Sequence, residues 1–131
     1  MTDPEQVARG LLGALQEAFV AHDLAAVTRL FDDEVVLFGT AAANLDRTQT
    51  DAYVARVIAQ EGILRWGWDQ VVPVLDEPGV LAFAVVGTVG FEDAQGQLVG
   101  ERDAFRLTCV AVLREGHWRL RHFHGSVPQQ G

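Results

Sequence analysis

The second half of the chain is divided into four long β-type segments by short turn peptides. The segments are ILRWGWDQVVPVLD, VLAFAVVGTVGFED, LVGERDAFRLTCVAVLRE and HWRLRHFHGSV, and they are rich in β-branched and aromatic residues. The peptides between them, EPG, DAQGQ and EG, contain residues that tight turns require. Because such short links can join only antiparallel neighbours, we expect an antiparallel meander.

The first part of the chain has helical periodicity instead. Asp3 and Pro4 suit the cap and the first turn of a helix, in which apolar residues recur every four positions from Val7 to Phe19. Asp23 can cap a short second helix over residues 24–31. Two helices are therefore expected before any strand.

A strand and a third helix complete this half. The stretch EVVLFG, residues 34–39, has strand composition, and Thr48 or Thr50 can cap a helix that ends at Gly62. Three helices followed by a meander indicate an α+β fold with the helices on one face of the sheet.

Composition limits the classes of function. The chain has 131 residues, enough for one domain (1–131), with a formal net charge of −8. We expect no binding to nucleic acid or membranes, because phosphate contacts need clustered basic residues. Cys109 is the single cysteine, so no internal disulfide is expected. The absence of a signal-peptide pattern and of a long apolar run favours a cytoplasmic protein.

The last hairpin determines which side chains face the core. If EG is a two-residue turn, uninterrupted alternation pairs His122 with Cys109 and His124 with Leu107. Both histidines would then point inward, although a one-residue bulge would reverse this locally. The expected inner face also carries Phe105, Ala111, Leu113, Trp118 and Leu120. The expected outer face carries Arg102, Arg106, Thr108, Arg114, Arg119, Arg121 and Phe123.

The same alternation predicts a ligand pocket. Glu101 and Asp103 fall on the inner face near the far end of their strand, and Trp66 and Trp68 share one face of another. Aromatic residues beside a few polar groups are typical of a small-molecule site. The predicted ligand-binding residues are Trp66, Trp68, Phe105, Cys109, His122 and His124.

The order of elements and two stretches of sequence resemble a known superfamily. GHWRLRHFHGSVP is similar to the ending of SnoaL-like domains and of the association domain of calmodulin-dependent protein kinases. AHDLAAVTRLFDDEVVLFG resembles the junction between the first helix and the first strand of the nuclear transport factor 2-like, or cystatin-like, superfamily. The resemblance covers nearly the whole chain. It implies three N-terminal helices on a curved, mostly antiparallel sheet that forms a cone.

The resemblance specifies the fold better than the chemistry, because the superfamily includes isomerases, cyclases, dehydratases and noncatalytic oligomerisers. The catalytic residues of ketosteroid isomerases match Leu15, Gly39 and Thr108 or Cys109 here, none of which can replace them. The arginines of the anion-binding pocket of the kinase association domains match Cys109 and Gly125. We therefore expect neither steroid isomerisation by the ketosteroid isomerase mechanism nor an anion-binding pocket of that kind.

Acid–base chemistry without a cofactor is the predicted activity, if the protein is an enzyme. Asp103 in a mostly apolar cone would be a stronger base, and His122 could act as acid or base. The alternatives are that the histidines only hydrogen-bond within the wall, that Asp103 pairs with an arginine at the rim, and that Cys109 is inert. A His-x-His metal site would need His22, Asp103 or Glu101 as a third ligand; no spacing motif supports it, so no metal is predicted.

Two functions remain open at this stage. The first is a small-molecule-binding protein for an apolar or aromatic ligand, with isomerase, cyclase or dehydratase chemistry by Asp103 and His122. The second is a noncatalytic dimerisation or ligand-sensing module. Since relatives dimerise through the outer face of the sheet, the resemblance implies a homodimer with an interface at Arg106, Val110, Arg119, Arg121 and Phe123.

Overall fold

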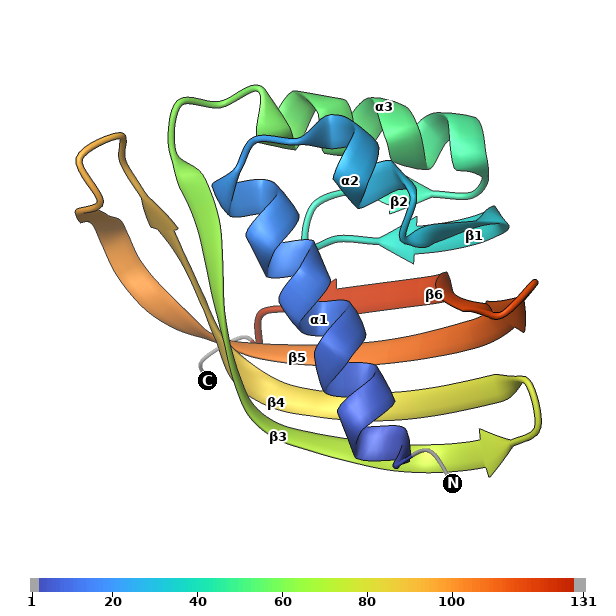
Figure 1. The fold of residues 1–131 in the computed structure, drawn as a ribbon. Coiled ribbons are helices and arrows are strands. Elements are labelled where there is room, and N and C mark those ends of the chain that lie inside the picture. The colour runs from blue at the N-terminus through green and yellow to red at the C-terminus, as the bar shows by residue number, and fades with distance from the viewer. Residues whose placement is uncertain (1–2, 129–131) are drawn as a thin grey trace.

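A computed structural model describes residues 3–128 as helices and a single six-stranded sheet (Figure 1). The elements in chain order are α1 (Pro4–Val20), α2 (Leu24–Thr28), β1 (Phe31–Phe38), β2 (Ala43–Asn44), α3 (Arg47–Ile58), β3 (Ile63–Glu77), β4 (Val80–Glu92), β5 (Leu98–Arg114) and β6 (His117–Ser126). The strand order is β2-β1-β6-β5-β4-β3, and only the β1–β6 pair is parallel. The predicted α+β fold and the meander of β3 to β6 are confirmed. The two-residue strand β2 was not predicted.

The helices begin where acidic side chains cap them. Asp3 accepts a hydrogen bond from the backbone of Glu5 at the start of α1, and Asp23 accepts one from Ala26 at the start of α2. The predicted threonine cap of α3 is wrong, because Asp46 caps this helix through the backbone N–H of Gln49.

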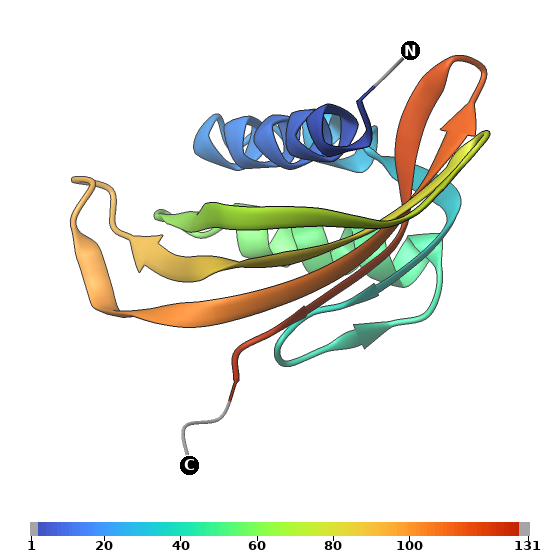
Figure 2. The same cartoon turned by 90° about the horizontal axis from the view of Figure 1, so that it is seen from below.

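The helices lie on one side of the sheet and leave the other side open. α1 runs diagonally across the strands and packs mainly on β3, whereas α3 packs beside β1 (Figure 1). The view turned by 90° shows the sheet bending away beneath α1 (Figure 2). The core between these layers includes Leu12, Val35, Phe83 and Leu120, none more than 2 % exposed. This packing defines an inner, helix-covered face and an outer face.

A β-bulge in β6 decides which residues belong to each face. The hairpin begins as predicted, with Ala111 opposite Leu120, but the next pair is Val110 with His122, so Arg121 is an extra residue. Beyond the bulge, Phe123 faces inward and is 7 % exposed, while His122 turns to the outer face.

The prediction that both histidines face the core is therefore wrong, as is the outward placement of Phe123. His124 pairs with Thr108 rather than Leu107, and it is exposed. The physical reason is burial: the bulge places an aromatic ring inside, worth about 1.5–3 kcal/mol. Uninterrupted alternation would have buried two imidazoles instead, each of which would need hydrogen-bond partners.

The outer face is largely apolar. Two rows of side chains cross it from β3 to β1, and apart from two imidazoles they carry no ionisable group. The rows are Leu75, Ala82, Val110, His122 and Val36, and Val72, Ala84, Thr108, His124 and Phe38.

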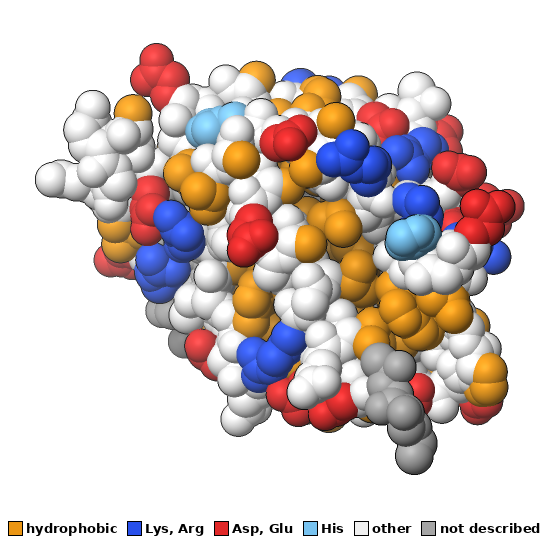
Figure 3. Space-filling view, in the orientation of Figure 1, with side chains coloured by type: hydrophobic (Ala, Val, Ile, Leu, Met, Phe, Trp, Pro, Cys, Tyr) orange, Lys and Arg blue, Asp and Glu red, His pale blue; other side chains and the backbone are white. Residues whose placement is uncertain are grey.

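The charged residues on the face covered by α1 are mixed in sign. Arginines lie among aspartates and glutamates there and form no continuous basic patch (Figure 3). Within residues 3–128, no helix is long and apolar enough to cross a membrane.

Candidate functional site

A cavity of about 310 Å³ lies between the helices and the inner face of the sheet. Its walls come from α1, α3, β1 and one end of the strands β3 to β6, and most of the side chains are apolar. They include Leu15, Phe19, Val54, Val57, Leu64, Val89, Phe91 and Phe123. A cavity of this size and lining is suited to a small apolar molecule.

Strand β5 extends from the depth of the cavity to its opening. Phe105, Asp103 and Glu101 alternate along one face of the strand and all three line the cavity. Phe105 is 4 % exposed, whereas both carboxylates are exposed, so they mark the opening. The sequence correctly placed these three side chains on the inner face. The burial that would strengthen Asp103 as a base is not found.

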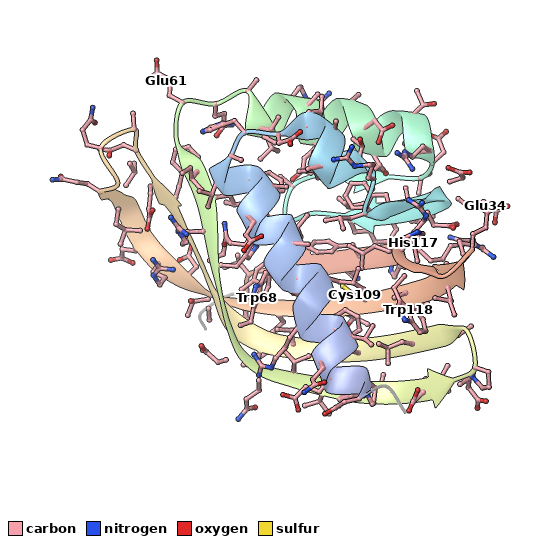
Figure 4. The ribbon with its side chains drawn as sticks, viewed as in Figure 1. Glu34, Glu61, Trp68, Cys109, His117 and Trp118 are labelled. Atoms are coloured by element: carbon pink, nitrogen blue, oxygen red, sulfur yellow. The ribbon has the colours of Figure 1, made fainter. Side chains whose placement is uncertain are left out.

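The two tryptophans of β3 have different roles. Trp66 lines the cavity, and its ring meets Phe19 of α1 edge-on at 5.2 Å between centroids. Trp68 stacks on Trp66 at 5.4 Å with an interplanar angle of 17° and lies next to α1 (Figure 4). Trp68 does not line the cavity. It therefore supports the ring of Trp66 from behind, and only Trp66 is available to a ligand.

Tyr53 is a polar residue of the cavity lining that was not predicted as a site residue; Thr40 is another. Tyr53 lies on α3, and its hydroxyl is so close to Gly39 that a Cβ there would lie 2.6 Å from the oxygen. Within residues 3–128 no hydrogen bond is formed by this hydroxyl. It is the single tyrosine of the chain and lies beside Val54 and Val57 on the apolar side of its helix. The sequence could have indicated this residue, because a tyrosine on the apolar side of a helix brings inward a hydroxyl for which no partner is predicted.

The two histidines lie outside the cavity. His122 Nδ1 is 2.8 Å from the backbone oxygen of Val36, and the Phe38 ring lies edge-on to both imidazoles at 5.5 and 5.3 Å. His122 therefore follows the alternative in which a histidine only hydrogen-bonds within the wall, but it does so on the outer face of the sheet. A role for His122 or His124 inside the cavity is excluded by this geometry.

Cys109 faces the core as predicted but does not reach the cavity. It pairs with Phe83 and Phe123 in one row of the inner face and is fully buried, behind α1 in Figure 4. Burial raises the pKa of the Cys109 thiol well above its ordinary value. The thiol therefore stays protonated and is a packing group.

The residues considered for a metal site do not come together. His22 Nδ1 lies 2.9 Å from the backbone oxygen of Ile58, far in the chain from the other candidates. Within the part of the chain that the structure describes, no three His, Cys, Asp or Glu side chains are placed to hold a metal ion.

A bent mixed sheet with helices on one face and a hollow between them defines an α+β domain with an interior cavity. The model of the SnoaL-like domain family matches residues 9–130, so the chain belongs to this family. A comparison with curated proteins gives no match.

Solved structures share the fold at low sequence identity. A candidate calcium/calmodulin-dependent protein kinase II association domain from Xanthomonas campestris is 19% identical, with a TM-score of 0.79 over 95% of this chain and 87% of that one. A candidate dehydratase of the NTF2-like family from Streptomyces avermitilis is 14% identical, with a TM-score of 0.81 over 96% of both chains. A protein with a cystatin-like fold from Caulobacter vibrioides is 18% identical, with a TM-score of 0.76 over 95% of this chain and 89% of that one. These likenesses confirm the predicted NTF2-like fold.

Proposed function

We propose that the protein binds a small apolar or aromatic molecule in the cavity between the helices and the sheet. The observation that carries this proposal is a space of about 310 Å³ whose wall is mostly apolar and holds a few polar groups at defined places. An apolar wall of this kind favours an apolar ligand, because the ligand removes the wall's surface from water. We also propose that sheet and helices enclose the ligand as a cone, and that the protein is cytoplasmic.

Filling the cavity tests this proposal. Val89 lies on the wall between Trp66 and Asp103, so Val89→Trp should occupy the space of the ligand. The control is Val74→Trp, at a position of β3 that is 63% exposed and away from the cavity. Isothermal titration with 2-naphthylmethanol, a neutral two-ring probe, should detect binding to the unsubstituted protein and to the control, and none to Val89→Trp. Equal binding by all three proteins would place the probe elsewhere and contradict the proposal.

Catalysis at this site would be an isomerisation, cyclisation or dehydration without a cofactor. Asp103 is the group suited to remove a proton, since it lines the cavity and is open to solvent. His122 cannot assist it from the outer face. Tyr53, whose hydroxyl has no protein partner in the described residues, is the available hydrogen-bond donor for a developing negative charge.

A noncatalytic dimer is the second function, and the uncovered outer face favours it. Val72 is 53% exposed and belongs to the two rows described above, which carry no carboxylate, lysine or arginine. Val86, 54% exposed, lies beside these rows and next to Arg106. A second copy of the chain would cover such a face with the same face, as two-fold symmetry requires. The proposed interface keeps Arg106, Val110, Arg119 and Arg121, but Phe123 is removed from it because this ring faces inward.

The oligomeric state tests the dimer. Val72→Glu adds a charge to a side chain that is already exposed, so it should leave the folded monomer intact and prevent pairing. Leu45→Glu, at a position that is 64% exposed outside the sheet face, is the control. Light scattering should give a dimer for the unsubstituted chain and the control and a monomer for Val72→Glu. A monomer in all three cases would remove the dimer proposal and leave the cavity proposal unaffected.

A further inference from the structure

The ionised groups that line the cavity are all acidic. Among residues 3–128, the lining contains the carboxylates of Glu101 and Asp103 and no lysine, arginine or histidine. In residues 3–128 no arginine or histidine forms an ion pair with either carboxylate. Arg102, between them in sequence, alternates toward the opposite face of β5, and Arg65 is already paired with Glu92 at 3.1 Å. An anion that enters the cavity therefore meets uncompensated negative charge at the opening.

A row of residues connects the aromatic wall to this opening. Trp66 pairs with Val89 across β3 and β4, and Val89 pairs with Asp103 across β4 and β5. Since neighbouring strands lie about 4.8 Å apart, the Cα atoms of Trp66 and Asp103 are separated by about 10 Å. A two-ring aromatic molecule over Val89, with one edge toward Trp66, can direct a substituent at its other end to the carboxylates.

We propose that the cavity takes a flat aromatic ligand that carries a positively charged nitrogen. The rings lie over Val89 beside Trp66, and the nitrogen lies at Asp103 and Glu101. This inference rests on the proposed binding function and adds the charge class of the ligand. The apolar cavity is the site and holds the rings; the two carboxylates only select the substituent. The Tyr53 hydroxyl, on the wall contributed by α3, can hydrogen-bond a second polar group of the ligand.

The size of the selectivity follows from solvent exposure. Both carboxylates are exposed, so their field is screened by water and salt. A contact between opposite charges in this setting changes affinity by roughly tenfold. We therefore expect a cationic probe to bind about tenfold more tightly than a neutral probe of the same shape, and an anionic probe about tenfold more weakly.

Three naphthalene probes test the charge class by titration calorimetry. They are 2-naphthylmethylamine as the cation, 2-naphthylmethanol as the neutral probe and 2-naphthylacetate as the anion. At low salt the order of affinity should be cation, neutral, anion. At about 1 M salt, where the screening length is about 3 Å, the order should contract to within a few-fold. The variant Glu101→Gln/Asp103→Asn should bind all three probes with affinities within about threefold of the neutral probe.

The matched control removes the same two charges elsewhere. Asp76→Asn/Glu77→Gln changes one Asp and one Glu, both exposed, at the far end of β3. It should keep the order of affinities, because these residues are not part of the cavity lining. Equal affinities for all probes, unchanged selectivity in Glu101→Gln/Asp103→Asn, or equal loss in the control would each overturn the charge assignment while leaving the binding proposal intact. Failure of every probe to bind would overturn both.

Discussion

The bulge in β6 predicts that two neighbouring residues respond very differently to truncation. Phe123 points into the core at 7 % exposure and lines the cavity, whereas His124 lies on the outer face and is exposed. We expect Phe123→Ala to destabilise the protein strongly and His124→Ala to have little effect. With uninterrupted alternation from the EG turn, the order of the two effects would be reversed.

The size of the Phe123→Ala effect follows from its surroundings. A buried aromatic side chain removes about 150–250 Å² from water, and at about 25 cal/mol per Å² this sets an upper limit of about 4–6 kcal/mol. Part of the ring borders the cavity and has no contacts to lose there, so we expect about 3 kcal/mol, the low end for Phe→Ala changes. For His124→Ala, which removes an edge-on contact with Phe38 at 5.3 Å, we expect about 0.5 kcal/mol or less.

Urea denaturation at low micromolar protein concentration measures both changes. Phe123→Ala should lower the free energy of unfolding by about 3 kcal/mol, and its melting temperature should fall by about 10–15 °C for a domain of this size. His124→Ala should stay within about 2 °C of the unsubstituted protein. If the histidine variant loses as much stability as the phenylalanine variant, or more, the bulge and the assignment of faces are wrong.

Three further predictions concern buried groups. Arg114 donates a hydrogen bond to the carboxylate of Asp32 and lowers the pKa of Asp32. This carboxylate therefore stabilises the fold above about pH 4, and the stabilisation is lost as the pH falls through the lowered pKa. Asp32→Asn should therefore cost about 1 kcal/mol at neutral pH, and this cost should shrink as the pH falls through the lowered pKa; a constant difference in unfolding free energy across pH would refute this. Native Cys109 should not react with a thiol reagent at neutral pH, because burial raises its pKa, and should react fully in urea; rapid labelling of the native protein would contradict its burial. Gly87→Ala should lower stability by about 2 kcal/mol in the same denaturation assay, since its Cβ would meet the backbone oxygen of Gly67, and an unchanged midpoint would contradict that close approach.

The parts of the fold that depend on local chemistry could be predicted from the sequence. Asp3 and Asp23 cap their helices as expected, and the turns EPG, DAQGQ and EG join strands that pair as a meander. The inner placement of Trp66, Phe105 and Asp103 also followed from period-two alternation. Each of these features is determined by residues close together in sequence.

The features that were mispredicted depend on partners far away in sequence. The bulge at Arg121 lies where β6 also pairs with the parallel strand β1, and the register of that pair shifts at the same place, between Phe31 and Val36. The register predicted by counting residues from the EG turn takes no account of the pairing with β1. One sequence signal did exist: Leu120 and Phe123, the apolar residues on either side of the bulge, are three positions apart, which strict alternation cannot place on one face.

The same bulge separates the two surfaces to which function can be assigned. By turning Phe123 inward it lines the cavity with an aromatic ring, and among the described residues of the lining the ionised groups are Glu101 and Asp103. By turning His122 and His124 outward it places both imidazoles on the apolar face proposed to pair with a second copy. The proposed ligand site and the proposed dimer face therefore use different side chains of one strand, so cavity variants and outer-face variants should act independently. A Val72→Glu protein that is monomeric and still binds 2-naphthylmethanol with unchanged affinity would establish that independence; a parallel loss of binding would show that the cavity needs the dimer.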